Sequence, residues 1–205
     1  VIAIEKDREL FVFLQEKFKK EIENKKLTLL EEDILLFKVK EKKYKILANI
    51  PYNITGAILK KFLTENIQPS LMVLMVQHEV AKRIVANDKK ESILSVSVKT
   101  YGTPKMIMKV PARYFSPAPK VDSAVIKISN ISRNIFNENH INEDVFWEVI
   151  HAGFAHKRKI LKGNLKNLNK TTNWSGILEK IGLKENIRAE DLSLKNWIDF
   201  ISLIK

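Results

Sequence analysis

Short unbroken apolar runs and helically spaced apolar residues alternate along the first part of the chain. Helical spacing covers residues 7–22 and 55–63, whereas the runs show no alternation with polar residues. These runs are residues 1–4, 27–30, 44–48 and 71–76. Strands that are apolar throughout are typical of sheets covered on both faces. The order strand, helix, strand, strand, helix, strand therefore predicts an α/β domain with a buried, mainly parallel sheet.

The pattern changes beyond Leu94. Prolines separate three β-like runs, residues 95–101, 106–110 and 121–128, which predict antiparallel additions to the sheet. Residues 130–142 are polar and rich in asparagine and serine, which is typical of a linker. After them, apolar residues recur at helical spacing, with the three tryptophans at core positions. We predict two domains, an α/β domain over residues 1–130 and a small all-helical domain over residues 131–205.

Charge and composition narrow the classes of partner and chemistry. The 205 residues include 36 Lys+Arg and 24 Asp+Glu, and the formal net charge of +12 favours nucleic acid before anionic membrane. The absence of cysteine excludes disulfides, thiolate metal sites and thiol redox chemistry. The longest apolar run has six residues, whereas a membrane-spanning helix needs roughly 20. We therefore expect no membrane partner. The four histidines lack metal-ligand spacing, so we also expect no metal.

The strongest chemical signal is Asn49-Ile50-Pro51-Tyr52, which follows a predicted strand. Ligands bind at such strand ends in open α/β sheets. Proline removes a backbone donor and restrains the preceding residue, so the Ile50 carbonyl can point outward. Together with the Asn49 side-chain carbonyl it would offer an amine two acceptors, while Tyr52 would offer a base a flat face. Such a site suits an aminopurine, and an ordinary Asn-Pro turn is the alternative.

Three segments, NIPYNIT, FSPAPKVDSAVIKI and FAHKRKILKGNL, resemble in sequence and order the ribosomal RNA adenine N6-dimethyltransferases of the KsgA/RsmA type. The resemblance spans nearly the whole chain. It implies a Rossmann-like methyltransferase domain that uses S-adenosylmethionine, followed by a helical RNA-recognition domain. It also implies dimethylation of the N6 amines of two adjacent adenosines in a hairpin loop near the 3′ end of small-subunit (16S) ribosomal RNA.

The resemblance implies roles for residues around the target base. Asn49 and Ile50 would hold the target amine through carbonyl oxygens, with Pro51 shaping the turn. Tyr52 and Phe115 would stack on the two faces of a base that has been flipped out of its own stack. Orientation of the amine would then be the main contribution to catalysis.

The resemblance also implies a cofactor-binding set. Glu5 would accept hydrogen bonds from the ribose hydroxyls of S-adenosylmethionine, because a carboxylate offers two acceptors to two vicinal donors. Asp33 would receive the adenine amino group, Ile34 would form an apolar wall, and Asn49 would complete the set. The neighbouring carboxylates of residues 31 and 32 compete with Asp33 for its role.

Basic residues form the predicted RNA contacts. No acidic residue occurs between Glu148 and Glu179, and lysines and arginines there would reach a phosphate backbone from a helix whose apolar residues pack inward. The predicted contacts are Lys120, Lys157, Arg158, Lys159 and Lys162, with Lys82 and Arg83 as further candidates. A generic basic surface is the alternative.

The chain departs from the family pattern in its glycines. None of the six glycines forms a glycine-rich loop, although the family has one after its first strand. The resemblance places that strand and loop upstream of Val1. We therefore expect the methyltransferase domain to be N-terminally incomplete in this chain.

These observations combine into one hypothesis, with two alternatives. We expect a cytoplasmic, monomeric, metal-independent methyltransferase that acts on small-subunit ribosomal RNA or the assembling small subunit. The alternatives are a non-catalytic RNA-binding factor in ribosome assembly, and a large-subunit enzyme of the macrolide-resistance type. The intact acceptor pair and Phe115 favour an enzyme, because binding alone does not require that pair.

Overall fold

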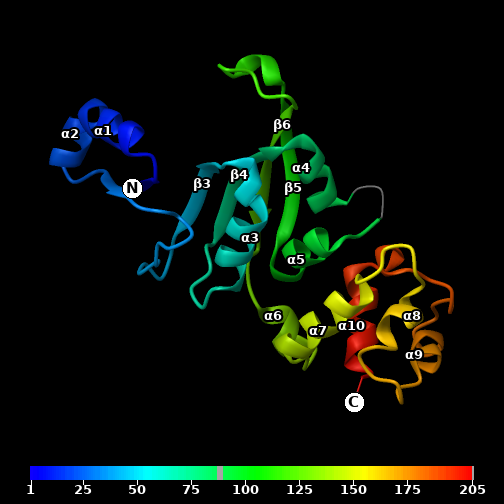
Figure 1. Ribbon diagram of the computed structural model, residues 1–205. Coiled ribbons are helices and arrows are strands. Elements are labelled where there is room, and N and C mark those ends of the chain that lie inside the picture. The colour runs from blue at the N-terminus through cyan, green and yellow to red at the C-terminus, as the bar shows by residue number, and fades with distance from the viewer. Residues whose placement is uncertain (87–89, 205) are drawn as a thin grey trace.

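The chain begins with a strand-helix-strand unit. In the computed structural model, which describes residues 1–86 and 90–204, β1 (Ile2–Glu5) pairs in parallel with β2 (Thr28–Glu31). The connection contains α1 (Arg8–Lys17) and α2 (Lys19–Glu23). The helix predicted over residues 7–22 is therefore confirmed, with a break at Phe18. Figure 1 shows this unit, in blue, beside the β3 edge of the main sheet.

A four-stranded sheet forms the centre of the molecule (Figure 1). Its strands are β3 (Lys45–Asn49), β4 (Leu71–Gln77), β5 (Thr103–Val110) and β6 (Ser123–Ser129), in the order β3-β4-β6-β5. β3 and β4 are parallel, and β6 is antiparallel to both of its neighbours, which confirms the antiparallel additions. The prediction of one mainly parallel sheet is wrong, because β1 and β2 form a separate sheet. An apolar run predicts that a strand is buried, but it does not predict which strand pairs with it.

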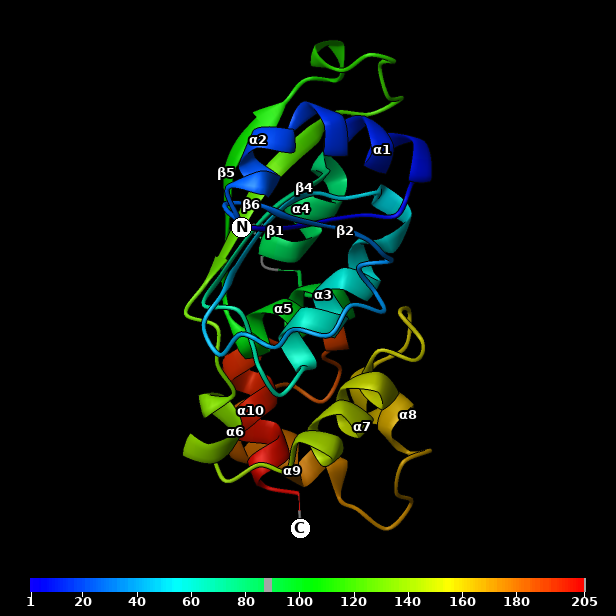
Figure 2. The same ribbon diagram turned by 90° about the vertical axis from the view of Figure 1, so that its left-hand side faces the viewer.

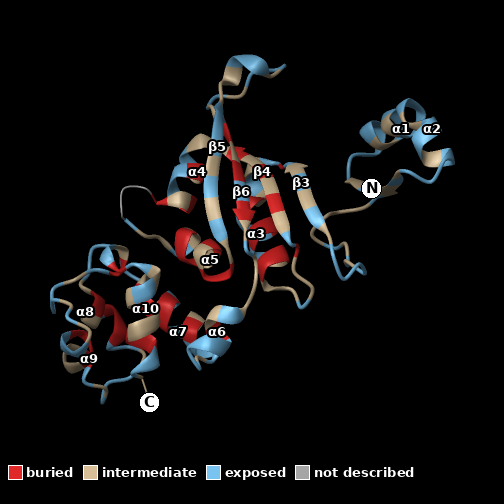
Figure 3. Ribbon diagram, turned by 180° about the vertical axis from the view of Figure 1, so that it is seen from behind, coloured by how far each residue is buried: buried red, intermediate tan, exposed pale blue. Residues whose placement is uncertain are grey.

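Only one face of the central sheet is well covered. On β4, Met72, Leu74 and Val76 are fully buried, whereas the residues between them are half-buried. The covered face shares a core with α3 (Thr55–Thr64), α4 (His78–Val85) and α5 (Ile93–Tyr101), whose buried residues are red in Figure 3. On the opposite face, Leu47 of β3 is 75 % exposed. The prediction of burial on both faces is therefore wrong for this sheet.

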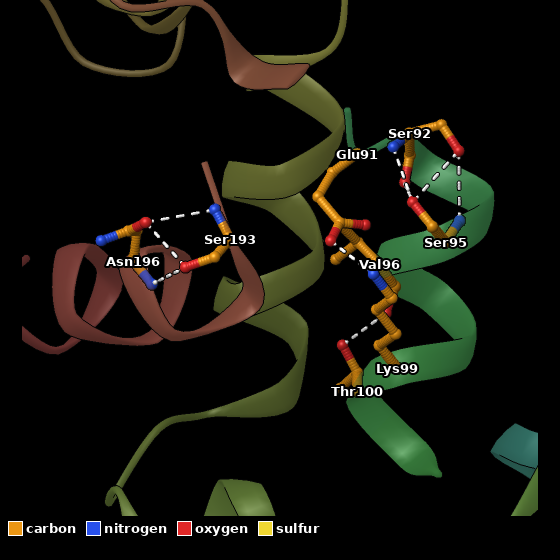
Figure 4. A network of polar contacts seen from close by, with 8 residues as sticks. All are labelled: Glu91, Ser92, Ser95, Val96, Lys99, Thr100, Ser193 and Asn196. Carbon is orange, nitrogen blue, oxygen red and sulfur yellow. Dashed lines mark hydrogen bonds and ion pairs between the residues drawn. The ribbon is translucent and has the colours of Figure 1, made fainter. Parts of the chain in front are cut away.

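The strand predicted over residues 95–101 is wrong, because this segment belongs to α5. The helix begins with a capping box, in which Ser92 Oγ accepts from the Ser95 N–H at 3.2 Å and Ser95 Oγ accepts from the Ser92 N–H at 2.7 Å (Figure 4). The hydroxyls of Ser97 and Thr100 donate to carbonyls one turn back, which satisfies polar groups within the helix. Neighbouring elements surround α5, so it lacks the polar face that reveals helical spacing in a sequence.

Helical elements follow β6 through the rest of the described chain. The α-helices are α6 (Asn134–Glu138), α7 (Glu143–Gly153), α8 (Leu161–Leu165), α9 (Trp174–Lys180) and α10 (Leu194–Ser202). The predicted linker, residues 130–142, contains α6, and the Phe136 ring packs edge-on against Tyr101 and Phe146. The segment is therefore part of the packed structure and not an open linker. The division of roles between residues 1–130 and 131–205 stays a prediction.

The α5 helix joins the sheet to the helical part (Figure 2). Tyr101 is 2 % exposed, and its hydroxyl donates to the Glu143 carboxylate and accepts from Trp147 Nε1 at 3.1 Å. Burial raises the pKa of Tyr101 well above its ordinary value, so the hydroxyl remains a donor. The Glu91 N–H donates to the Glu190 carbonyl at 2.8 Å. These contacts fix how the two parts sit together.

Candidate active site

The candidate site begins where β3 ends and the chain turns into α3. Pro51 has φ −59° and ψ 132°, and the short 3₁₀ helix η1 (Tyr52–Ile54) follows it. The Ile54 N–H donates to the Pro51 carbonyl at 3.2 Å, and the Thr55 hydroxyl donates to the Tyr52 carbonyl at 3.1 Å. Asn49 is exposed, and its carboxamide has no hydrogen bond to another residue that the structure describes. The turn therefore presents a free carboxamide from a fixed backbone.

Tyr52 is tethered to a distant strand. Its hydroxyl lies 2.6 Å from Ser123 Oγ, and Ser123 is fully buried as the first residue of β6. Ser123 pairs with Gln77 of β4 on one side and with Val110 of β5 on the other. The tether therefore connects the turn after β3 to the first residue of β6, an inner strand of the sheet.

The loop that carries Phe115 leaves the same end of the sheet. β5 ends at Val110, and the 3₁₀ helix η2 (Ala112–Tyr114) leads to Phe115, which is half-buried. The Asp122 carboxylate accepts from the Ala112 N–H at 2.9 Å and pairs with Lys109 Nζ at 2.6 Å. Lys109 and the Ala112 N–H hold the pKa of Asp122 below its ordinary value. The loop is therefore bound at both of its ends.

Strand direction gathers these groups at one end of the sheet. Because β3, β4 and β5 run in the same direction and β6 runs against them, the residues at this end are Asn49, Gln77, Val110 and Ser123. The structure thus brings Asn49, Ile50, Pro51 and Tyr52 to the same end as the loop of Phe115 and Lys120. Figure 1 shows that loop, in green, extending beyond the sheet.

Of the predicted cofactor residues, Glu5 lies in the separate N-terminal unit, Asp33 and Ile34 follow directly after it, and Asn49 ends β3. Glu5 ends β1, and its carboxylate accepts from the Asp7 N–H at 2.8 Å. Asp33 pairs with Lys6 Nζ at 2.8 Å and accepts from the Leu35 N–H at 2.9 Å, and Ile34 is half-buried beside it. Within the described ranges, no hydrogen bond or ion pair joins Glu5 or Asp33 to Asn49. The structure therefore places Glu5, Asp33 and Ile34 near one another but, among the described residues, links Glu5 and Asp33 to the target-base turn through no polar contact.

The ion pair of Asp33 can be tested by titration. Its hydrogen bond to Lys6, followed by that to the Leu35 N–H, lowers the pKa of Asp33 below the ordinary 3.8. We expect Lys6→Ala to raise this pKa toward 3.8, measured by carboxyl NMR during acid titration. The stabilising pair is present above the ordinary pKa and is lost as the pH falls through the pKa of the folded protein. Lys20→Ala, on an exposed surface of α2, is the control. An unchanged Asp33 titration in Lys6→Ala would contradict the assigned cause.

The basic segment of the helical part is a turn and not a helix. Residues 154–160 connect α7 to α8, and Lys157, Arg158 and Lys159 are exposed there, so the predicted helical presentation is wrong. The buried Asn164 shapes this turn, because its Nδ2 donates to the Gly153 carbonyl at 2.6 Å and to the His156 carbonyl at 3.2 Å. These side-chain bonds take the place of helical ones.

A cleft of about 770 Å³ separates α4 from the basic turn. Its cationic lining comes from both parts of the molecule and includes Lys82 and Arg83 of α4 and Lys157 and Lys159 of the basic turn. Two of the acidic residues in the lining have lysine partners, since Glu91 pairs with Lys99 at 2.6 Å and Glu190 lies 3.9 Å from Lys90. A net positive lining remains, which suits a polyanion.

The remaining predicted RNA contacts differ in availability. Lys120 is exposed in the loop after β5. Lys162 already forms an ion pair with Glu185, and this pair lowers the pKa of the Glu185 carboxyl. Lys162 would therefore have to exchange a partner to contact RNA.

The described residues also bear on two other classes of site. They contain no group of three or more His, Asp or Glu side chains arranged to hold a metal ion. None of their helices is both long enough and apolar enough to cross a membrane.

Sequence reasoning missed three residues that shape the site. Ser123 and Asp122 lie within the FSPAPKVDSAVIKI segment, and Asn164 lies within FAHKRKILKGNL. These segments carried the family resemblance, so their position was a signal. Only the structure shows which groups the three side chains contact.

Comparison with known proteins agrees with this architecture. The sequence pattern of the family described as "Ribosomal RNA adenine dimethylase" matches residues 1–205. A "Ribosomal RNA small subunit methyltransferase A" from Dehalococcoides mccartyi is 37% identical over 204 residues, covering 96% of this chain and 68% of the relative. One of the same description from Fusobacterium nucleatum is 35% identical over 212 residues, covering 100% of this chain and 78% of the relative.

Solved structures share the fold. A dimethyladenosine transferase from Plasmodium falciparum superposes with a TM-score of 0.79 at 24% identity, covering 98% of this chain and 80% of that one. The 23S rRNA methyltransferase ErmE superposes with a TM-score of 0.74 at 19% identity, with the same coverage. These likenesses confirm the predicted Rossmann-like α/β fold with helical additions.

Proposed function

Because this chain belongs to the ribosomal RNA adenine dimethylase family, we propose that it methylates the N6 amine of adenosines in small-subunit ribosomal RNA. The observation that carries the proposal is the free Asn49 carboxamide on a fixed turn at the end of the sheet. The curated relatives are named for the small subunit, which favours that RNA over large-subunit RNA. We further propose two adjacent adenosines in a 3′-terminal hairpin loop as the target.

The turn residues orient the target amine. The Asn49 side-chain oxygen and the Ile50 carbonyl accept its two N–H groups, which leaves the nitrogen lone pair facing away from the turn. Tyr52 and Phe115 hold the flipped base between their rings. Positioning of this kind can account for a large part of a rate enhancement. Once it has taken the methyl group, the nitrogen carries a positive charge and becomes acidic, so its proton can pass to water without a dedicated base.

The N-terminal unit contains acceptor groups that fit S-adenosylmethionine. When bound, this molecule supplies an electrophilic methyl group. The carboxylates of Glu5 and Asp33 suit ribose hydroxyls and an adenine amino group, and each has acceptor capacity beyond its present hydrogen bonds. Ile34 would contribute apolar contact to the adenine, and Asn49 would approach from the sheet.

The cationic cleft would bind the RNA backbone near the target base. His78 lines the cleft, and its backbone N–H donates to the Asp122 carbonyl at 2.9 Å, so the cleft opens beside the candidate active site. Lys82 and Arg83 would contact phosphates from one wall, and Lys157 and Lys159 from the other. Arg158, Lys120 and Lys162 would extend the contact surface. A protein with a ribosomal substrate of this kind would act in the cytoplasm.

Removing the charges of the basic turn should weaken RNA binding without slowing the chemical step. We expect Lys157→Gln/Lys159→Gln to raise the KM for the small subunit about tenfold and to leave kcat within about twofold. The slope of log affinity against log salt should become shallower by about 0.7–0.9 for each phosphate that the variant no longer neutralises. Lys180→Gln/Lys184→Gln removes the same charge from exposed positions outside the cleft. Equal effects of the two double variants would indicate a generic basic surface.

The choice among the three functional hypotheses rests on one assay. Purified protein, labelled S-adenosylmethionine and unmethylated ribosomal subunits would be combined, and methyl incorporation would be measured in small and large subunits separately. We expect incorporation into small subunits. Incorporation into large subunits alone would favour the macrolide-resistance type. Tight RNA binding with no incorporation would favour a non-catalytic factor.

A further inference from the structure

Asp122 and Ser123, at the start of β6, contact the segments that follow β3, β4 and β5 at the end of the sheet that carries the candidate active site. Ser123 bonds the hydroxyl of Tyr52 after β3. The Asp122 carboxylate holds the Ala112 N–H in the loop after β5, and the Asp122 carbonyl accepts from the backbone N–H of His78 at the start of α4. One dipeptide therefore connects every loop that leaves this end of the four-stranded sheet.

The position of this dipeptide makes it a rigid anchor. β6 lies between β4 and β5, and Ser123 is paired with Gln77 and Val110 at the same time. The Ser123 side chain has no exposed surface. An anchor bonded on both sides inside a sheet moves less than the loops that it holds.

The Tyr52 hydroxyl has no role in stacking itself, because a phenylalanine ring would offer a base a similar flat face. A hydrogen bond of 2.6 Å to a buried hydroxyl instead fixes the ring against rotation about its side-chain bonds. Tyr52 is thus held at its main chain by η1 and at its tip by Ser123.

We propose that Asp122 and Ser123 are positioning residues that set the two aromatic walls of the target-base site, Ser123 through Tyr52 and Asp122 through the turn that leads to Phe115. This inference rests on the proposed function. Neither residue touches the base. Each acts by keeping an aromatic ring where a flipped adenine must stack, so that the amine meets the Asn49 turn in one orientation.

A double-mutant cycle tests the proposed role of Ser123 in positioning Tyr52. We expect Ser123→Ala and Tyr52→Phe each to lower kcat for methyl transfer about tenfold, with the KM for the small subunit within about twofold. Because both changes remove the same hydrogen bond, the double variant should also be about tenfold slower and not a hundredfold. Ser129→Ala, at the other end of β6, is the matched control and should leave kcat unchanged.

A conservative substitution tests the proposed role of Asp122. Asp122→Asn keeps an oxygen that can accept from the Ala112 N–H, so we expect kcat within about threefold of wild type. Asp122→Ala removes that acceptor and should lower kcat about tenfold. Thermal unfolding of every variant, with assays well below the midpoint, separates loss of geometry from loss of folded protein.

The outcomes separate this inference from the proposed function. No methyl transfer by wild-type protein would overturn the proposed function itself. An active wild type with full kcat in Ser123→Ala, or with effects of Ser123→Ala and Tyr52→Phe that multiply, would overturn the role of Ser123. Equal loss in Asp122→Asn and Asp122→Ala would overturn the role of the Asp122 acceptor.

Discussion

Asn49→Ala should lower kcat for methyl transfer by about 100-fold or more while leaving small-subunit binding within about twofold. The carboxamide has no partner among the described residues, so its removal takes away no structural hydrogen bond. What is lost is one of two acceptors that orient the amine. Initial rates of labelled methyl incorporation and a separate RNA-binding assay would measure the two effects.

Two further variants give this prediction its control. Asn66→Ala removes an exposed carboxamide after α3, away from the turn, and should leave kcat unchanged. Asn49→Gln keeps the carboxamide but displaces it, and a displacement of about 1 Å can cost about 100-fold in rate. We therefore expect Asn49→Gln to resemble Asn49→Ala. An Asn49→Ala variant within tenfold of wild type would refute the role assigned to Asn49.

Trp197→Ala should lower the free energy of unfolding by about 3–5 kcal/mol, measured by denaturant titration. Trp197 is fully buried in α10, and its ring lies 5.7 Å from the Phe154 ring and 6.3 Å from the Phe200 ring, between centroids. A Cβ at Gly153 would lie 2.5 Å from Trp197 Cη2, so the glycine is what admits the indole. The cavity left by alanine would adjoin the turn that carries the basic residues.

The indole nitrogen of Trp197 affects how much stability the substitution should cost. Trp197 Nε1 is buried and has no hydrogen-bond partner among the described residues, so its removal recovers part of the lost stability. Trp197→Phe removes that group and keeps most of the apolar volume, so its loss should be smaller. Lys195→Ala, exposed on the same helix, should change stability by less than about 0.5 kcal/mol. A loss below about 1 kcal/mol for Trp197→Ala would contradict its role in the core.

The candidate site was predictable where its chemistry is local in sequence. Asn49 to Tyr52 are consecutive, and a proline after an apolar strand limits the backbone to few conformations. The contacts of Ser123 were not predictable, because a hydroxyl can bond many partners and its partner is 71 residues away. The basic residues of the turn were predicted, but the conformation of their backbone was not. That conformation depends on hydrogen bonds from the buried Asn164.

Sequence alone determined where most strands and most helices lie along the chain, the turn at Asn49, the basic character and, through three segments, the family. These features depend on neighbouring residues and on side-chain type, which a sequence states directly. Tertiary structure alone decided that α5 is a helix, that the four strands β3–β6 form one sheet apart from β1 and β2, and that Asp122 and Ser123 join the loops of the site. Those outcomes depend on which distant groups satisfy a buried hydroxyl, carbonyl or carboxylate, and spacing along the chain does not encode that choice.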